Sequence, residues 1–255
     1  MSAPDILAVA SGTAVGLILA LIGGGGSILA TPALLYVVGV SNPHLAIGTS
    51  ALAVSVNAFA NLINHARRGH VQWACAGVFA AAGVLGAALG AQLGKATNPD
   101  VLLPLFALLM IVVGFSMLRP RKADGGGEVR LDARTAPRLA GAGAGVGALS
   151  GFFGIGGGFL IVPGLIAASG MSMIQAIGSS LLSVGVFGAT TAASYAMDDL
   201  IDWRIAALFI GGGLLGGAFG ASAATRLARS RGALQRVFAG VVFVVAAYML
   251  WRSLA

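Results

Sequence analysis

The chain has 255 residues, of which 58% are hydrophobic and only 9% are charged, against roughly 25% charged residues in soluble domains. So few charges cannot cover the surface of a water-soluble protein, which excludes that class and indicates a membrane protein. The net charge of +7 would also suit a nucleic-acid-binding protein, but the positions of the charges, described below, assign it to membrane topology.

The first apolar stretch, Ile6–Val40, is longer than the roughly 20 residues that cross a bilayer as one helix, and glycines interrupt it at Gly23–Gly26. Its second arm, Ile28–Val40, is short for a full span. The stretch therefore predicts a helical hairpin that enters and leaves the membrane on the same side, with its second helix starting at Ser27–Ile28. We expect no cleavable signal peptide, because no Lys or Arg precedes the stretch.

Three uninterrupted apolar runs follow the hairpin, and each approaches the length of a membrane-spanning helix. They are continuous and rich in Ala, Leu and Gly, so they favour helices over the alternating segments of about ten residues that form a membrane β-barrel. These runs are Leu45–Asn64, Trp73–Leu93 and Val101–Leu118.

A polar segment, Arg119–Arg138, divides the chain into residues 1–118 and 139–255. It is charged and contains Gly125–Gly127, so it is predicted to be a flexible linker outside the membrane. The second half repeats the order of the first, because a glycine-interrupted stretch, Leu139–Ser169, again precedes three spans. Two of these spans are Ile205–Ala223 and Val237–Trp251.

The two halves are also related residue by residue, which indicates an internal repeat. The segment Gly23–Pro32 matches Gly154–Pro163, and Ala46–Ser50 matches Ala176–Ser180 after a gap of one residue. The match extends over most of each half and is too long to result from composition alone. In the same register, Trp73 aligns with Trp203, Gly86 with Gly216 and Gly90 with Gly220.

Basic residues collect in the cytoplasmic loops of membrane proteins, and most of those in this chain can share one side. Twelve of the 15 lie in three groups: Arg67 and Arg68, the linker, and Arg226, Arg229, Arg231 and Arg236. We therefore expect the linker in the cytoplasm and both termini in the periplasm or exterior. Because the loop with Arg67 and Arg68 aligns with the loop that carries Asp198 and Asp199, equivalent loops are expected on opposite faces, with the repeats inverted. The predicted fold class is an all-α polytopic membrane protein of two inverted repeats, each a glycine-broken helical hairpin plus three transmembrane helices.

Inverted repeats with glycine-broken segments occur in many secondary transporters. Here the paired glycine segments lead into Pro32 and Pro163, and Ile-Gly-Thr-Ser and Ile-Gly-Ser-Ser motifs follow at 47–50 and 177–180. With these motifs the whole chain resembles the TauE/SafE sulfite exporter family. The resemblance implies a bacterial inner-membrane carrier that exports sulfite, sulfoacetate or a related sulfur-containing anion. The two hairpins differ where Gly24 aligns with Ile155 and Ser27 with Gly158.

The glycine turns are the first candidate binding site for an anion. A helix start presents unpaired N–H groups and roughly half a positive charge, and glycine lets an anion approach that backbone closely. The alternative is that these glycines only permit tight hairpin packing. The candidate residues are Gly24, Gly25, Gly26 and Ser27 in the first turn and Gly156, Gly157 and Gly158 in the second.

Two polar stripes form the second candidate site. Ser50, Asn57, Asn61 and Asn64 share one helix face, and Ser180, Ser183, Thr191 and Ser194 occupy the corresponding face of the other half, with Phe187 in place of Asn57. Thr49 and Ser179 flank the stripes. Polar groups in hydrocarbon are unfavourable unless they pair or line an aqueous cavity, so the stripes predict the walls of a central pathway. Ordinary hydrogen bonds between helices are the alternative.

A secondary carrier of a small anion by alternating access is the function that these features favour, and a passive channel is the runner-up. No Lys, Arg, Asp or Glu falls in the middle of a predicted span, so dipoles would hold the anion. An intramembrane enzyme is disfavoured because no Ser–His pair, paired carboxylates or His/Cys metal cluster occurs within the spans, and a non-transport membrane subunit is a further, less favoured alternative. We expect no catalytic residue, metal or cofactor, no nucleic-acid partner, and a lipid bilayer around the chain; a homo-oligomer and a proton-carrying role of His65 stay open.

Overall fold

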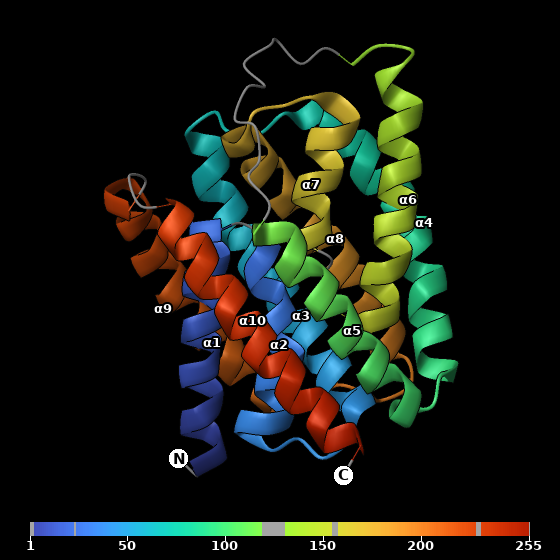
Figure 1. Ribbon diagram of the computed structural model, residues 1–255, viewed down its shortest axis with the longest axis vertical. Coiled ribbons are helices and arrows are strands. Elements are labelled where there is room, and N and C mark those ends of the chain that lie inside the picture. Colours follow the sequence, from blue (N-terminus) through green and yellow to red (C-terminus); the bar gives the residue numbers. More distant parts are fainter. Residues whose placement is uncertain (1–2, 23, 119–130, 155–157, 228–230, 255) are drawn as a thin grey trace.

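The computed structural model describes the chain except for residues 1–2, 23, 119–130, 155–157, 228–230 and 255. The described residues are helical and contain no strand (Figure 1). The first half consists of α1 (Ala3–Ile22), the 3-10 helix η1 (Gly24–Leu29), α2 (Ala30–Pro32), the π-helix η2 (Ala33–Val38), α3 (Pro43–Arg67), α4 (Trp73–Ala96) and α5 (Pro99–Leu118). The second half consists of α6 (Thr135–Phe153), α7 (Gly158–Ser169), α8 (Met173–Ala196), α9 (Trp203–Leu227) and α10 (Arg231–Leu254).

Five of the described helices are long and apolar enough to cross a membrane. This confirms the prediction of an all-α polytopic membrane protein. The five segments are Ala3–Leu21, Pro43–Arg67, Trp73–Ala96, Ile174–Ala196 and Trp203–Gly220. The helix α6 begins at Thr135, so the last residues assigned to the linker form its first turn.

Local side-chain chemistry sets where the long helices begin. Asn42 precedes α3, and its side-chain oxygen accepts the backbone N–H of His44 at 2.9 Å, while Pro43 takes the first helical position. Ser172 and Gln175 form a reciprocal capping box at the start of α8. Asp202 caps α9 by accepting the backbone N–H of Ile205 at 2.9 Å. Each cap satisfies N–H groups that have no partner within the helix.

Glycines bring two pairs of helices into direct backbone contact. Where α1 packs on α9, a Cβ added at Gly16 would lie 2.1 Å from the carbonyl oxygen of Gly213. Where α6 packs on α4, a Cβ added at Gly147 would lie 2.1 Å from the carbonyl oxygen of Gly83. In lipid, such van der Waals contact replaces the hydrophobic effect as the force that holds helices together, so both pairs depend on residues without a side chain.

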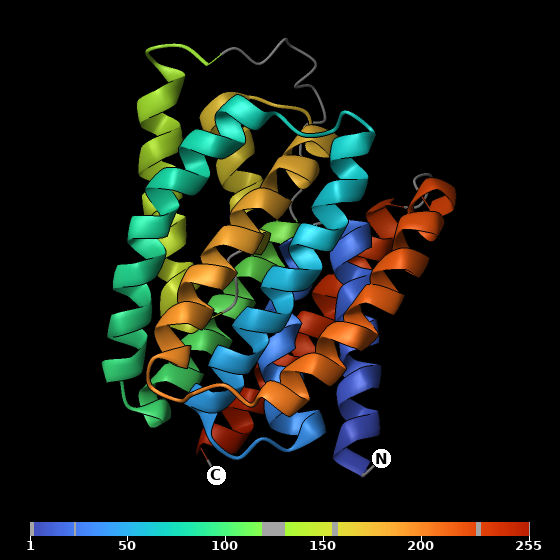
Figure 2. The same cartoon turned by 180° about the vertical axis from the view of Figure 1, so that it is seen from behind.

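The hairpins enter the bundle from opposite ends (Figure 1). The second arm of the first hairpin returns to the end where α1 begins. In the second hairpin, α6 begins at the opposite end of the bundle and α7 returns to that same end. Figure 2 shows the α3–α4 turn at one end of the bundle and the α8–α9 turn at the other. Helices α3 and α8 cross between them, and Ser55 Oγ donates to the carbonyl oxygen of Gly185 at 2.7 Å. An inverted repeat would produce this arrangement; the repeat relation itself stays a prediction.

Candidate functional site

The turn of the first hairpin differs from its predicted form. The expectation that the second arm starts as a helix at Ser27–Ile28 is wrong, because the 3-10 helix η1 already begins at Gly24. Gly24, Gly25 and Gly26 therefore form its first turn instead of preceding it. The N–H groups of a first turn have no partner within the helix, so the backbone donors at this turn belong to the glycines, and Ser27 lies one residue further along and is fully buried.

At Gly154, where the second hairpin turns, both the backbone conformation and the surrounding space require glycine. Gly154 ends α6 in the left-handed conformation with φ +64°, and a Cβ at this position would lie 2.0 Å from Cγ2 of Ile47 on α3. Helix α7 begins at Gly158, where the sequence predicted a helix start. Gly156 and Gly157 lie outside the described residues. Because η1 contacts α7, the second arms of the two hairpins meet inside the bundle.

A chain of hydroxyl groups joins the first hairpin to α3. Thr31 Oγ1 lies 2.8 Å from Ser50 Oγ, and Ser50 Oγ donates to the carbonyl oxygen of Ile47 at 3.0 Å. Since Ser50 has a single hydroxyl hydrogen, Thr31 must be the donor of the first bond. Ser180 on α8 likewise donates to the carbonyl oxygen of Ile177 at 2.8 Å. In this conformation, therefore, the O–H groups of Ser50 and Ser180 are already engaged by backbone oxygens.

Thr49 and Ser179, predicted to flank the pathway, each hold a loop of the other half. Thr49 Oγ1 accepts the backbone N–H of Asp202 at 2.9 Å, and Ser179 Oγ accepts the backbone N–H of Gln72 at 2.9 Å. Both side chains are fully buried. The preceding glycine makes room for each loop, because a Cβ at Gly48 would lie 2.1 Å from the carbonyl oxygen of Leu200. The two Ile-Gly-Thr/Ser-Ser motifs thus form two equivalent clasps between the halves.

The stripe residues Asn57 and Asn61 face the glycines of α9. The Asn57 side chain is 1% exposed, and neither its amide nitrogen nor its amide oxygen has a hydrogen-bond partner among the described residues. A Cβ at Gly213 would lie 2.1 Å from that nitrogen, so this part of the stripe is closed by direct contact. Asn61 Nδ2 donates to the backbone oxygen of Asn57 at 2.9 Å.

The corresponding position of α8 is apolar. Phe187 packs on Gly83 of α4, as Asn57 packs on Gly213 of α9. The ring of Phe187 also stacks on Phe79, with their centroids 6.3 Å apart. In both contacts a side chain packs against a glycine of the neighbouring helix, but the side chain is a polar amide at Asn57 and an apolar ring at Phe187. The side of α3 that faces α9 therefore offers an amide where the side of α8 that faces α4 offers a ring.

Further buried hydroxyls lack a hydrogen-bond partner among the described residues. Ser183 and Thr191 of the predicted stripe belong to this group, and both are fully buried on α8. Ser150, near the end of α6, is also fully buried and unpartnered, and the sequence analysis missed it. It lies four residues before the second glycine turn, and this nearness to the turn was the available signal. These hydroxyls have hydrogen atoms left to donate to a ligand.

The described interior contains almost no charge. The buried charged side chain among the described residues is Asp5, which lies at the start of α1 and accepts from the Arg204 guanidinium at 2.8 Å. Neither residue is near the middle of a span. No group of three or more His, Cys, Asp or Glu residues that could hold a metal occurs within the described parts of the chain. Amide, hydroxyl and backbone N–H groups, together with the imidazoles of His44, His65 and His70, are therefore among the polar groups of the described residues that could bind a ligand.

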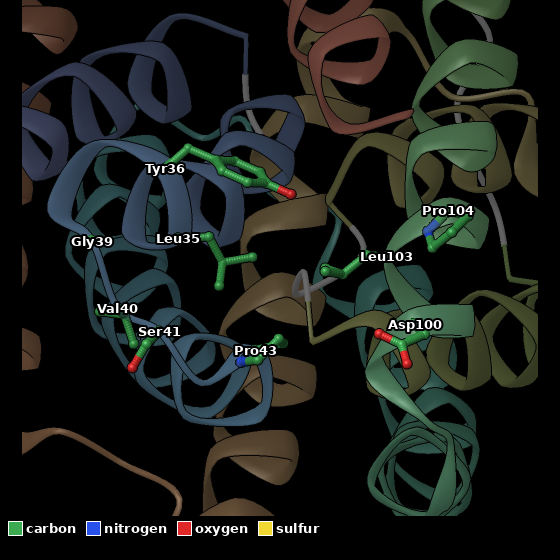
Figure 3. A pocket seen from close by; sticks show the side chains of 9 residues that line it. All are labelled: Leu35, Tyr36, Gly39, Val40, Ser41, Pro43, Asp100, Leu103 and Pro104. Carbon is green, nitrogen blue, oxygen red and sulfur yellow. The ribbon is translucent and has the colours of Figure 1, made fainter. Parts of the chain in front are cut away.

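A cavity of about 550 Å³ opens at the end of the bundle that carries the termini. Figure 3 shows Leu35 and Tyr36 of η2 facing Asp100, Leu103 and Pro104 of α5 across it. None of the predicted binding residues is among those that line this cavity. Because the exposed Asp100 carboxylate repels anions, the cavity does not suit the predicted substrate class.

Comparison with known protein families matches residues 8–249 to the family described as "Sulfite exporter TauE/SafE". Two proteins of Xylella fastidiosa, from strains Temecula1 and 9a5c, are each 55% identical over 251 residues, which cover 98% of this chain and 96% of theirs. Both are named "Probable membrane transporter protein". YunE of Bacillus subtilis, a "Probable membrane transporter protein", is 25% identical over 85% of this chain and 87% of its own. No solved structure matches the chain.

Proposed function

Because the chain belongs to the TauE/SafE sulfite exporter family, we propose that it is a secondary transporter of a small sulfur-containing anion such as sulfite or an organosulfonate. It works by alternating access and exports its substrate. The family is shown by the match over residues 8–249, while the substrate and the direction are the proposal.

The observation that carries the proposal is a buried set of neutral donors between helices. The Asn57 amide and the hydroxyls of Ser183 and Thr191 are buried donors of this kind, and the first turn of η1 adds backbone N–H groups. Such groups can replace part of an anion's hydration shell without the strong attraction of a buried guanidinium, so the anion can also leave. Because the Asn57 amide lies against Gly213, a local widening of the helix contact at this point would expose it to the substrate while the bonds at the start of α9 stay intact.

We further propose that the chain lies in the bacterial inner membrane with its linker in the cytoplasm and its termini in the periplasm. The charges support this orientation. Arg67 and Arg68 lie at the α3–α4 turn, and Asp198 and Asp199 lie at the α8–α9 turn at the opposite end of the bundle (Figure 2). The basic end faces the cytoplasm by the positive-inside rule.

The experiment is anion flux in vesicles reconstituted with the purified chain, with protein-free vesicles as the control. Sulfite, sulfoacetate, thiosulfate and sulfate are compared as substrates. A carrier accelerates uptake of labelled sulfite when unlabelled sulfite is loaded on the other side, whereas a passive channel does not. Flux of none of these anions above the protein-free control would contradict the proposed function.

A further inference from the structure

The helices of the two halves do not pack as two separate units. Among the described residues, α1 of the first half packs most extensively on α9 of the second, and α4 of the first half packs most extensively on α6 of the second. In addition α3 packs on α8, more extensively than α3 packs on α9 or α4 packs on α8. Two helices of the same half, α1 and α4, therefore have their main partners in the other half and on different sides of the bundle.

Polar contacts join α9 to helices of the first half. Arg204 at the start of α9 donates to the buried Asp5 carboxylate of α1 at 2.8 Å. The backbone N–H of Asp202, just before α9, donates to Thr49 of α3 at 2.9 Å. With the glycine contact between α1 and α9, these bonds hold α1, α3 and α9 together as one group.

A second set of polar contacts joins α4 to α8 in the same manner. Lys95 at the end of α4 pairs with Asp198 and donates to the backbone oxygen of Ser194 at 3.1 Å. Gln92 Nε2 donates to the Ser194 hydroxyl at 3.3 Å. At the other end of α4, Gln72 donates its backbone N–H to Ser179 of α8 at 2.9 Å. With the glycine contact between α4 and α6, these bonds hold α4, α6 and α8 together.

The boundary between the two groups runs along α3 and α8. Across this helix pair, among the described residues, Ser55 Oγ donates to the Gly185 carbonyl oxygen at 2.7 Å. The contact of η1 with α7 lies on the same boundary. Packed groups separate where the fewest polar bonds and the least backbone contact must be broken. Helices α3 and α8 pack closely, but they belong to different halves, so separating the halves of the sequence would break this boundary and, in addition, the more extensive α1–α9 and α4–α6 contacts.

We infer that transport moves two rigid bodies against each other: a first body of α1, α3 and α9, and a second body of α4, α6 and α8. We call them exchanged bodies because each combines helices from both halves of the sequence. The inference rests on the proposed transporter function and specifies which parts move. Rocking of residues 1–118 against residues 139–254 would have to pull α1 off α9 and α4 off α6, which breaks both glycine interfaces and both sets of polar bonds. Movement of the exchanged bodies leaves both glycine interfaces and both sets of polar bonds intact.

Pairs of spin labels distinguish the two motions, with every variant made in a Cys75→Ala background. The pair Ile6→Cys and Leu215→Cys lies on α1 and α9, in different halves but in the same body. The pair Ile6→Cys and Leu89→Cys lies on α1 and α4, in the same half but in different bodies. All three native side chains are more than half exposed, at 58%, 58% and 68%, so labels fit without disturbing the packing. Distance distributions are recorded in lipid nanodiscs with and without sulfite.

The expected result is one unchanged distance for the pair on α1 and α9, and a shifted or two-peaked distribution for the pair on α1 and α4. The pair Leu85→Cys and Leu149→Cys, on α4 and α6 of the second body, is the matched control and should also give one distance. A constant α1–α4 distance, or a changing α1–α9 distance, overturns the inference. Sulfite flux is measured separately, so loss of the proposed function and loss of the exchanged bodies give different results.

Discussion

The amide of Asn57 on α3 rests on the backbone of Gly213 on α9, without a hydrogen-bond partner among the described residues. A buried amide in this state destabilises the conformation that contains it by about 1–3 kcal/mol. The amide is therefore better satisfied in a conformation in which it meets water or a ligand. The contribution of Asn57 to stability and its contribution to transport can therefore be measured separately.

Replacing the amide by an apolar group of similar volume should lower transport without lowering stability. We expect Asn57→Leu to raise the KM for sulfite roughly tenfold, as loss of one hydrogen bond to a charged group implies. Its thermal unfolding temperature in detergent should be unchanged or higher, because no satisfied bond is lost. Asn61→Leu should impair transport in the same direction. The control is Phe187→Leu at the corresponding position of α8, which should lower stability but leave KM unchanged. Wild-type flux by Asn57→Leu would show that the stripe only packs.

The clasps at Thr49 and Ser179 should behave in the opposite way. Thr49→Val leaves the N–H of Asp202 unpaired, and Ser179→Ala does the same to the N–H of Gln72. Each change should reduce the free energy of unfolding by about 1–3 kcal/mol, measured by denaturant titration in mixed micelles. The KM for sulfite should not change, and Thr49→Ser should restore stability because it keeps the oxygen. A raised KM with unchanged stability would instead place these hydroxyls in the substrate site.

The first glycine turn should be sensitive to side-chain bulk. Gly25→Val places a β-branched side chain over the N–H groups at the start of η1, which blocks close approach of an anion to the backbone. We expect affinity for sulfite to fall at least about tenfold, which corresponds to roughly 1.4 kcal/mol, in protein that still inserts and stays monodisperse. Gly141→Val on α6 is the matched control, since no atom lies within 4 Å of an added Cβ there. Equal affinity in both variants would remove the turn from the site.

The orientation can be tested at two exposed positions at opposite ends of the bundle. In a Cys75→Ala background, Met197→Cys probes the α8–α9 turn, where the native side chain is 85% exposed. Leu131→Cys, with a native side chain 42% exposed, probes the segment just before α6. A membrane-impermeant maleimide added to whole cells should label residue 197, and label residue 131 only after permeabilisation. The reverse pattern would invert the proposed topology.

The sequence predicted the helices well because their signals are local. Continuous apolar runs marked α3, α4 and α9, and Trp73 and Trp203 begin two of these helices at aligned positions. The start of η1 at Gly24 escaped prediction because a run of glycines has no side chains from which a helix start can be recognised.

The candidate site was only partly predictable, because the partners of its hydroxyls lie far away in the sequence. Thr49 and Asp202 are separated by most of the chain, and a lone hydroxyl in an apolar run fits a clasp as well as a pathway. Ser150 was missed for a related reason. It lies on the first arm of a hairpin, outside both polar stripes, and only packing shows that it is buried without a partner.

The backbone contact of α1 with α9 also bears on how the protein is made. The helix α1 leaves the ribosome first, but Gly212 and Gly216, which fit against its Val9 and Thr13, are synthesised only after seven further membrane or hairpin segments. Until α9 is made, the face of α1 that packs on it contacts lipid or the insertion machinery instead. A ribosome that stalls before α9 should therefore leave an unpaired helix for membrane quality control to degrade. The two halves expressed as separate polypeptides should accumulate only when both are present in the same cell.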